Sequence, residues 1–438
     1  MSEDFILKGG RVIDPASGID SEMDVLVSDG KVTEVGQRLA ANAEVIDVAG
    51  SVVAPGLVDV HVHLREPGRE DEETIASGSA CAAMGGFNAV CAMPNTDPAC
   101  DNASVAEKIR AAGSLAGLVE VIPAGALTKG RKGLELAQIG EMARSSARVK
   151  LFTDDGTGVQ DARLLRRAME YLNAFGGICA EHCEDEALSA GGHMHEGEVS
   201  SRLGLPGIPA EAEETALARD LALARLTGVR FHVQHVSTAR GLKLIEEAKA
   251  EGLDVTVEVT PHHLCFTDSE LESYDPNFKV NPPLRPGSDV EALREGLASG
   301  AIDMIATDHA PHAPEEKEGE FELAPPGMLG LETALSVINT ELILPGVITW
   351  TRAIEAMSVN PARLLGLDRY GGPFAPGSPA NLVVFDPEVE WEVSSSAMES
   401  LSRNTPWEGR SLKGRVTHTV FEGRFVVRAS TLVQAAVV

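Results

Sequence analysis

The sequence lacks both a long apolar run and a surplus of basic residues. No stretch approaches the roughly 18 consecutive apolar residues of a membrane-spanning helix, so none is expected. Lys and Arg total 37 against 66 Asp and Glu, which gives a formal net charge of -29. Nucleic acids and anionic membranes require a basic surface, so both kinds of partner are excluded. The same charge repels anionic small molecules, and a few local cations must bind any such substrate.

Closely spaced cysteine pairs are missing as well. The six cysteines lie in apolar segments without Cys-x-x-Cys spacing, a pattern typical of reduced thiols. Cys179 and Cys183 flank His182, and we expect them to be buried thiols and not metal ligands. The first residues do not combine a basic segment with an apolar one, so no signal peptide is expected. These features together predict a cytoplasmic protein.

Both ends of the chain predict β structure. Short alternating segments with Gly and Asp turns occupy residues 1–54 and 366–438, and this period-2 pattern indicates antiparallel strands. Neither end is large enough to form the core of a sheet alone. We therefore expect one small β-sandwich domain built from both termini.

The middle of the chain, residues 55–365, has a different pattern. Apolar β-type runs alternate with helical segments, which is typical of parallel βαβ units. Eight such units favour a (β/α)8 TIM-type barrel, and a doubly wound sheet is the alternative. The predicted strands are 57–64, 88–93, 118–125, 148–153, 177–181, 230–236, 254–259 and 302–307.

The first of these strands runs into His61-Val62-His63-Leu64-Arg65. Alternate side chains of a strand share a face, so His61 and His63 converge at the strand end. Two such imidazoles form half of a metal site. Arg65 has the same parity and adds a guanidinium that can pair with a carboxylate. The pattern favours metal-assisted hydrolysis of an anionic substrate.

Further polar side chains lie where other predicted strands end. The carboxyl ends of barrel strands meet at one face, so these side chains are expected to lie together. Four histidines and two carboxylates exceed one tetrahedral zinc site and fit two metal ions that share a carboxylate and a hydroxide. His232 has the opposite parity to His235 and is expected to pack in the outer layer. The strand-end residues are Asn95, Asp155, His182, His235, Asp308 and His312.

These motifs together resemble the amidohydrolase superfamily and, within it, the long bacterial-type dihydroorotases. The resemblance covers nearly the whole chain. It implies zinc-dependent, reversible cyclisation of N-carbamoyl-L-aspartate to (S)-dihydroorotate in pyrimidine (UMP) biosynthesis. The motifs are His-Val-His-Leu-Arg-Glu-Pro-Gly (61–68), Ala-Met-Pro-Asn-Thr (92–96), Phe-Thr-Asp-Asp-Gly (152–156), Glu-His-Cys-Glu-Asp (181–185), His-Val-Ser-Thr (235–238), Thr-Pro-His-His-Leu (260–264), Val-Asn-Pro-Pro-Leu-Arg (280–285), Ala-Thr-Asp-His-Ala-Pro-His (306–312) and Asn-Thr-Pro-Trp-Glu-Gly (404–409).

The resemblance also implies a role for individual residues. Two zinc ions would share Asp155 and a hydroxide that acts as the nucleophile, and Asp308 would serve as general base and then acid. The zinc ligands implied are His61, His63 and Asp308 for one ion, His182 and His235 for the other, and Asp155 as the bridge. The substrate-binding residues implied are His63, Arg65, Asn95 and His312 around the carboxylate, and Asn281, Pro326 and Gly327 around the ring. Pro326 departs from the family pattern, in which an aromatic residue more often precedes the glycine.

Several alternatives stay open at this point. Lys150 resembles the carboxylated lysine that bridges the metals in related enzymes, although the Thr-Asp-Asp-Gly run favours Asp155. A dihydropyrimidinase, hydantoinase or allantoinase would act on a ring without a carboxylate, which would leave Arg65 without a partner. An inactive scaffold for aspartate transcarbamoylase is disfavoured because all six metal positions are filled. Aspartate transcarbamoylase and a second copy of the chain are the protein partners considered.

Overall fold

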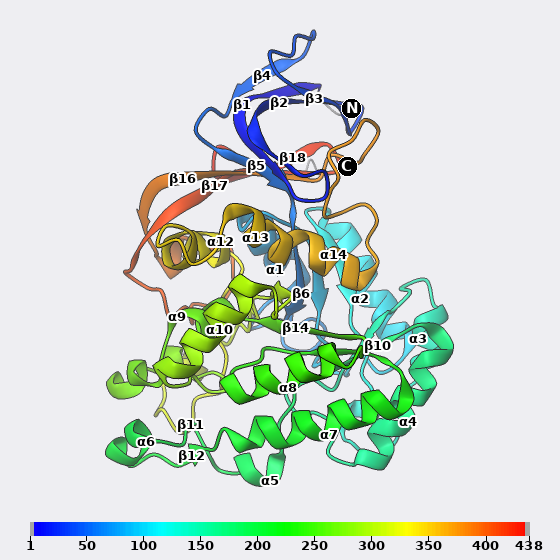
Figure 1. Ribbon diagram of the computed structural model, residues 1–438, viewed down its shortest axis with the longest axis vertical. Helices are drawn as coiled ribbons and strands as arrows, with labels where there is room; N and C mark the ends of the chain where they lie inside the picture. Colours follow the sequence, from blue (N-terminus) through cyan, green and yellow to red (C-terminus); the bar gives the residue numbers. More distant parts are fainter. Residues whose placement is uncertain (1–3, 434–438) are drawn as a thin grey trace.

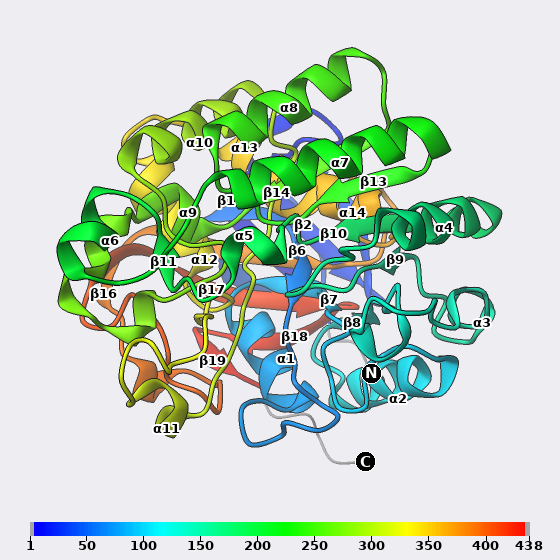
Figure 2. The same cartoon turned by 90° about the horizontal axis from the view of Figure 1, so that it is seen from below.

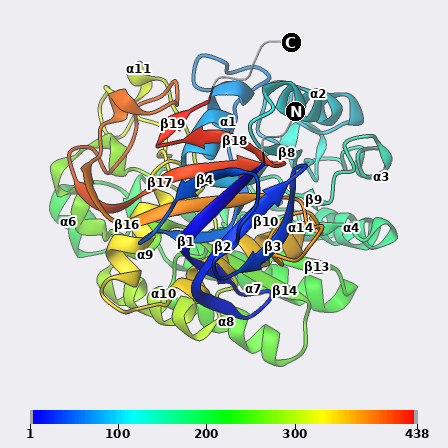
Figure 3. The same ribbon diagram turned by 90° about the horizontal axis from the view of Figure 1, so that it is seen from above.

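The computed structural model describes residues 4–433, which form a β-rich part and a barrel of strands surrounded by helices (Figure 1). Seen from above, strands from both ends of the chain cross in front of the barrel (Figure 3). None of the helices within the described residues is long and apolar enough to span a membrane.

Strands from both ends of the chain form one sheet. Its order is β19-β18-β17-β16-β5-β1-β2-β3, with β4 paired to β1. The two ends meet where β5 pairs antiparallel with β16. The expectation of antiparallel pairing throughout is wrong, because β1 pairs parallel with both β4 and β5. The strands are β1 (Phe5–Asp14), β2 (Ile19–Ser28), β3 (Lys31–Gly36), β4 (Glu44–Asp47), β5 (Val52–Pro55), β16 (Leu382–Glu392), β17 (Ser411–Phe421), β18 (Arg424–Arg428) and β19 (Thr431–Leu432).

The sheet has a core to which both ends of the chain contribute. Phe5 and Val25 from the first strands pack with Leu382 and Val420 from the last ones, and all four side chains are buried. Burial of apolar area is the main favourable term in folding, so neither end has this core without the other. The prediction of one β domain built from both termini is confirmed.

Eight parallel strands close the barrel within residues 57–305. β6, β7 and β8 pair in one run, and β9, β10, β13, β14 and β15 pair in another. Parallel bridges join the two runs at both ends, Gly125 with Phe152 and Val62 with His309. The closed ring confirms the TIM-type barrel, because a doubly wound sheet keeps two open edges. The strands are β6 (Leu57–Val62), β7 (Phe87–Ala92), β8 (Glu120–Pro123), β9 (Leu151–Phe152), β10 (Ile178–Glu181), β13 (Arg230–Val233), β14 (Val255–Val259) and β15 (Met304–Ile305).

Helices surround the ring of strands (Figure 2). α4 illustrates why they form, since Asp161 caps its first turn and Leu165, Ala168, Met169 and Leu172 make one buried stripe at helical spacing. The longer helices are α1 (Ile75–Met84), α2 (Ala103–Ala116), α3 (Ile139–Arg144), α4 (Ala162–Leu172), α6 (Glu198–Leu203), α7 (Glu211–Thr227), α8 (Ala239–Ala250), α10 (Gly287–Ser299) and α14 (Asn360–Leu365). Shorter elements are α5 (Glu186–Ser189), β11 (Met194–His195), β12 (Gly207–Ile208), α9 (Pro261–Cys265), α11 (Pro314–Lys317), α12 (Ala334–Ile338) and α13 (Trp350–Ile354).

Gly56 separates the sheet from the barrel. The apolar run 52–60, which resembles a single strand in sequence, divides here into β5 and β6. A Cβ atom on Gly56 would lie 1.4 Å from Oδ1 of the buried Asn88. Asn88 cannot easily move away, because its Nδ2 donates to the carbonyl of Val420 in the sheet at 3.0 Å. The junction therefore requires a residue without a side chain.

Gly56→Ala should lower the free energy of unfolding by about 1–3 kcal/mol, the usual cost of overpacking a filled interior. Urea denaturation followed by circular dichroism measures it. Gly319→Ala is the matched control, because a Cβ there meets nothing within 4 Å. Equal stability of the two variants would show that the contact at Gly56 relaxes without cost.

Candidate active site

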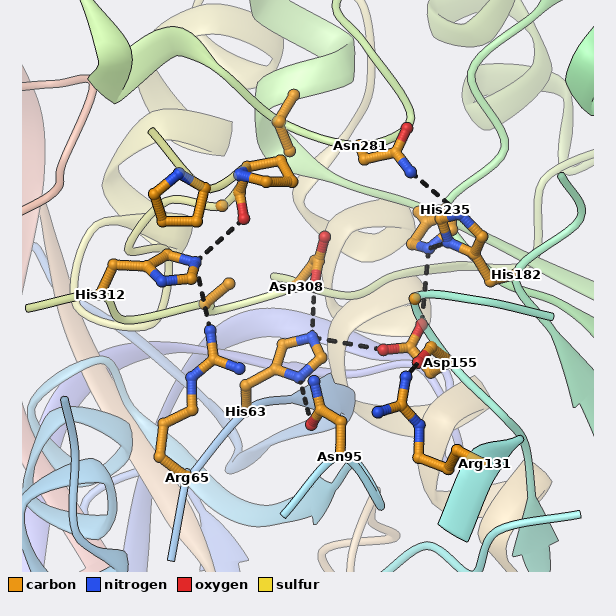
Figure 4. A pocket seen from close by; sticks show the side chains of 16 residues that line it. His63, Arg65, Asn95, Arg131, Asp155, His182, His235, Asn281, Asp308 and His312 are labelled. Carbon is orange, nitrogen blue, oxygen red and sulfur yellow. Dashed lines mark hydrogen bonds and ion pairs between the residues drawn. The ribbon is translucent and has the colours of Figure 1, made fainter. Parts of the chain in front are cut away.

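The predicted site residues meet in one cavity at the carboxyl ends of the barrel strands (Figure 4). The cavity has a volume of about 250 Å³. Its walls include Asp155, His182, His235 and Asp308. All seven residues predicted to bind substrate line it as well, namely His63, Arg65, Asn95, Asn281, His312, Pro326 and Gly327.

The six predicted metal ligands form one buried cluster behind this cavity. Their nitrogen and oxygen atoms make three overlapping groups in which all the atoms lie within 4.8 Å of one another. Asp155 belongs to two of the groups and so connects them. The groups are His61 with His63 and Asp155, His61 with His235 and Asp308, and Asp155 with His182 and His235.

The donor atoms of this cluster fit metal binding. His61 Nε2 is buried and has no hydrogen-bond partner within residues 4–433, yet it lies 3.3 Å from Asp155 Oδ1 and 3.4 Å from Asp308 Oδ1. A buried polar atom of this kind is uncommon unless an ion or water satisfies it. Nδ1 of His182 and Nε2 of His235 also face each other at 2.9 Å. Four imidazoles with two carboxylates are a donor set that suits zinc.

Glu258, on β14, orients two of the histidines from inside the barrel. Its Oε1 lies 2.6 Å from His61 Nδ1, and its Oε2 lies 3.0 Å from His232 Nε2. Burial alone would raise the pKa of Glu258, but the two imidazoles outweigh burial and hold that pKa at about 2. A carboxylate on the second nitrogen of a ligating histidine sets its tautomer and ring orientation. The sequence analysis missed Glu258, although a single carboxylate within an apolar strand was a usable signal.

His232 is therefore not in the outer layer, and that expectation is wrong. Phe231 and Val233 belong to the apolar core, whereas His232 points into the barrel and reaches Glu258. The parity argument failed because His235 lies beyond the end of β13 at Val233. Its backbone has a positive φ of 30°, so strand alternation does not extend to it.

His63 and Asp308 connect the cluster to the cavity. His63 Nε2 lies 2.9 Å from Asp308 Oδ1, and His63 Nδ1 lies 2.9 Å from Asn95 Oδ1. Asp308 has a φ of 48° and Arg65 a φ of 59°. Non-glycine residues rarely adopt such a backbone conformation. The residues that adopt it are often found at functional sites.

Arg65 and His312 lie together on the side of the cavity opposite His182 and His235 (Figure 4). Arg65 Nη2 is 3.3 Å from His312 Nε2, which also lies 2.9 Å from the carbonyl of Pro326. A Cβ on Gly327 would approach His312 Nε2 to 2.8 Å, so this turn needs glycine. The two nitrogen-rich side chains make this wall suitable for a carboxylate.

Asn281 lies on the metal side of the cavity, where its Nδ2 is 3.2 Å from His182 Nε2. His263 holds the neighbouring backbone, because its Nε2 lies 2.9 Å from the carbonyl of Pro282. His263 thus supports the Asn281 loop, whereas Nε2 of the adjacent His262 has no hydrogen-bond partner among the described residues.

Lys150 lies apart from the cluster. It is exposed and comes directly before β9, so it is at the amino end of a strand whose carboxyl end carries Asp155. A Cβ on Gly366 would lie 2.5 Å from Lys150 Nζ, which places this amine beside the end of α14. The resemblance of Lys150 to a bridging lysine is not supported by its position.

Arg131 is a further cavity residue that the sequence analysis missed. Its guanidinium donates to the backbone carbonyl of Asp155, and its buried Nε has no partner among residues 4–433. Arg131 lies well beyond the end of β8 at Pro123, so no strand-end pattern indicates it. The six cysteines are all free thiols, and Cys179 and Cys183 are buried as expected.

Comparison with known proteins gives one family by sequence. A family model described as dihydro-orotase-like matches residues 50–241. A dihydroorotase from Pelotomaculum thermopropionicum is 51% identical over 425 residues, which cover 97% of this chain and 98% of that protein. A dihydroorotase from Anaeromyxobacter sp. is 50% identical over 430 residues and covers the same shares of the two chains.

Comparison with solved structures gives the same architecture. An L-hydantoinase (dihydropyrimidinase) from Arthrobacter aurescens superimposes with a TM-score of 0.87 at 27% identity, over 99% of this chain and 98% of the other. A dihydropyrimidinase from Brevibacillus agri has a TM-score of 0.83 at 24% identity, over 98% and 96% of the two chains, and is similar in fold alone. The sequence is thus much closer to dihydroorotases, and the fold is shared with enzymes named for other cyclic amides.

Glu258→Gln should weaken zinc binding by about 10- to 100-fold, the usual effect of losing a carboxylate that orients a metal-binding histidine. Competition with a chromophoric chelator measures the affinity. Glu246→Gln, an exposed change on α8, is the control and should have no effect. Unchanged zinc affinity in a folded Glu258→Gln protein would contradict the orienting role.

Proposed function

This chain belongs to the dihydroorotase family, and we propose how its residues carry out the reversible cyclisation of N-carbamoyl-L-aspartate to (S)-dihydroorotate. The observation that carries the proposal is the presence of two different sites in one cavity. A metal-type cluster lies on one side, and the Arg65–His312 pair lies on the other. This arrangement suits hydrolysis of a cyclic amide that also bears a carboxylate.

The cluster would hold two zinc ions. His61, His63 and Asp308 would bind one ion, His182 and His235 the other, and Asp155 would bridge them. When bound, zinc supplies an activated water as nucleophile and polarises the carbonyl that is attacked. Asp155 Oδ1 lies 3.3 Å from His61 Nε2 and 3.7 Å from His235 Nε2, whereas Lys150 is exposed beside the end of α14, and these positions support Asp155 as the bridge.

Asp308 would move the proton during ring opening. Its carboxylate faces the cavity beside His63 and can accept a proton from the attacking water. The same carboxyl group then returns the proton to the departing ring nitrogen. In the direction of synthesis, the two transfers run in reverse.

The remaining cavity residues would bind and orient the substrate. Arg65, Asn95 and His312 would hold the ring carboxylate, with His63 beside it. Asn281, on the metal side, and Pro326 and Gly327, beside His312, would contact the ring. The guanidinium of Arg65 provides the local attraction that an acidic protein needs for an anionic substrate.

Three expectations from the sequence remain proposals. They are a cytoplasmic location, association with aspartate transcarbamoylase, and formation of a homodimer. An inactive scaffold is not supported, because the six ligand positions are filled and converge.

Purified protein should hydrolyse dihydroorotate with a kcat/KM at least about 10- to 100-fold above the values for dihydrouracil, hydantoin and allantoin. These three rings have no carboxylate, and charge-assisted hydrogen bonds account for a preference of this size. Absorbance assays of ring opening measure the four rates. A preference for an uncharged ring would contradict the assignment.

The same assay tests the role of Asp308. Asp308→Ala should reduce turnover of dihydroorotate by at least ~100-fold, the lower end for loss of a general acid–base group. Asp254→Ala is the matched control, because Asp254 is exposed and pairs only with Arg230 at 3.6 Å among the described residues. Near-normal turnover in the Asp308 variant would overturn its role.

A further inference from the structure

We propose that Glu72 is a positioning residue that holds Arg65 and His312 in the geometry that binds the substrate carboxylate. The inference rests on the proposed function, because it concerns the same carboxylate site. Nothing in the motif pattern assigns a role to Glu72, which lies in the loop between the His-x-His strand and α1.

Glu72 contacts both carboxylate-binding side chains at once. Its Oε2 lies 3.0 Å from Arg65 Nε, and its Oε1 lies 3.0 Å from His312 Nδ1. Arg69 Nη2 lies 3.0 Å from the same Oε1. The Glu72 side chain is 2% exposed and is not among the residues that line the cavity. It therefore acts on the substrate through Arg65 and His312 and not by contact.

The two residues that Glu72 joins come from different strands. Arg65 follows β6 and His312 follows β15, and a parallel bridge joins Val62 of β6 to His309 beyond β15. Arg65 is also tied to this segment by its Nε, which donates to the carbonyl of Pro311 at 3.0 Å. Glu72 adds a second, charged connection between the residues that follow β6 and those that follow β15.

Glu72 is itself held firmly in place. Its backbone nitrogen donates to the carbonyl of Arg69 at 3.0 Å, and its carbonyl accepts a hydrogen bond from Ser402 Oγ at 2.7 Å. A side chain fixed at its backbone can fix its partners, which is the property expected of a positioning group. Rigid placement matters because misplacing binding groups by about 1 Å costs much of their effect.

A carboxylate is suited to this position because it pairs by charge with the guanidinium of Arg65, whose Nε hydrogen goes to the carbonyl of Pro311. It also accepts a hydrogen bond from His312 Nδ1 in the tautomer in which His312 Nε2 accepts from Arg65 Nη2. A glutamine carries no charge, so the ion pair with Arg65 would be lost. An aspartate keeps the charge but is one methylene shorter and cannot span both contacts.

The negative charge of Glu72 by itself would weaken binding of the substrate carboxylate. A negative group behind Arg65 and His312 repels the substrate carboxylate, so a purely electrostatic role predicts tighter binding once that charge is removed. A positioning role predicts weaker binding. Glu72→Gln therefore separates the two roles by the direction of the change.

The experiment measures KM and kcat for dihydroorotate in the zinc-loaded Glu72→Gln and Glu72→Asp proteins. Both variants should raise KM by about 10- to 100-fold, the size expected for losing one or two charge-assisted hydrogen bonds, with kcat within about threefold of wild type. Glu70→Gln, an exposed change on the same loop, should leave both constants unchanged. Zinc content and the thermal unfolding midpoint are measured on every protein.

An unchanged or lower KM in Glu72→Gln would overturn the proposal, and so would a fall in kcat that follows loss of zinc or of stability. If Glu72→Gln does not fold, Glu72→Asp alone decides by the same criterion. Failure of the proposed function gives a different result, because the wild-type protein would then not convert dihydroorotate at all.

Discussion

The closure of the barrel between β6 and β15 is the contact on which the site depends. The backbone nitrogen of His63 donates to the carbonyl of His309 at 2.8 Å, directly beside the bridge from Val62. This register places His63 Nε2 against Asp308 Oδ1 and brings Arg65 to His312. A shift of one residue would turn every side chain of β6 to the other face, and the metal cluster and the carboxylate site would both be lost. The contact that closes the barrel therefore also positions the residues of the site.

Two buried carboxylates near this contact are paired with cationic or imidazole side chains. Glu258 pairs with His61 and His232, and Glu72 pairs with Arg65 and His312. A buried charge without a partner is expensive, and a paired one holds its partner in a fixed orientation. The same carboxylates that make the protein acidic thus orient its few functional cations and imidazoles. The net charge of the chain and the local charge of the cavity are different properties, and only the local charge decides which substrate binds.

Sequence reasoning predicted the parts of this structure that follow from periodicity and from motifs. The alternation of strands and helices predicts the barrel, and strand parity brings His61 and His63 together. It missed Glu258, whose only signal is a single carboxylate within an apolar strand, and it misplaced His232 because strand alternation does not extend from Val233 to His235. The requirement for glycine at position 56 could not be predicted either, since it arises from a contact with Asn88, which is distant in sequence. The left-handed backbone at Arg65, His235 and Asp308 is likewise set by tertiary contacts and not by local preference.

We expect two metal ions to share Asp155 at the end of the barrel, opposite a wall that binds a carboxylate. Diffraction from crystals of the zinc-loaded protein, recorded at the zinc absorption edge, would show both ions and their ligands. Two anomalous peaks are expected within the cluster of four histidines, with Asp155 in contact with both ions and Lys150 unmodified. A single peak in fully active protein, or density for a carboxylated Lys150 between two ions, would contradict this expectation.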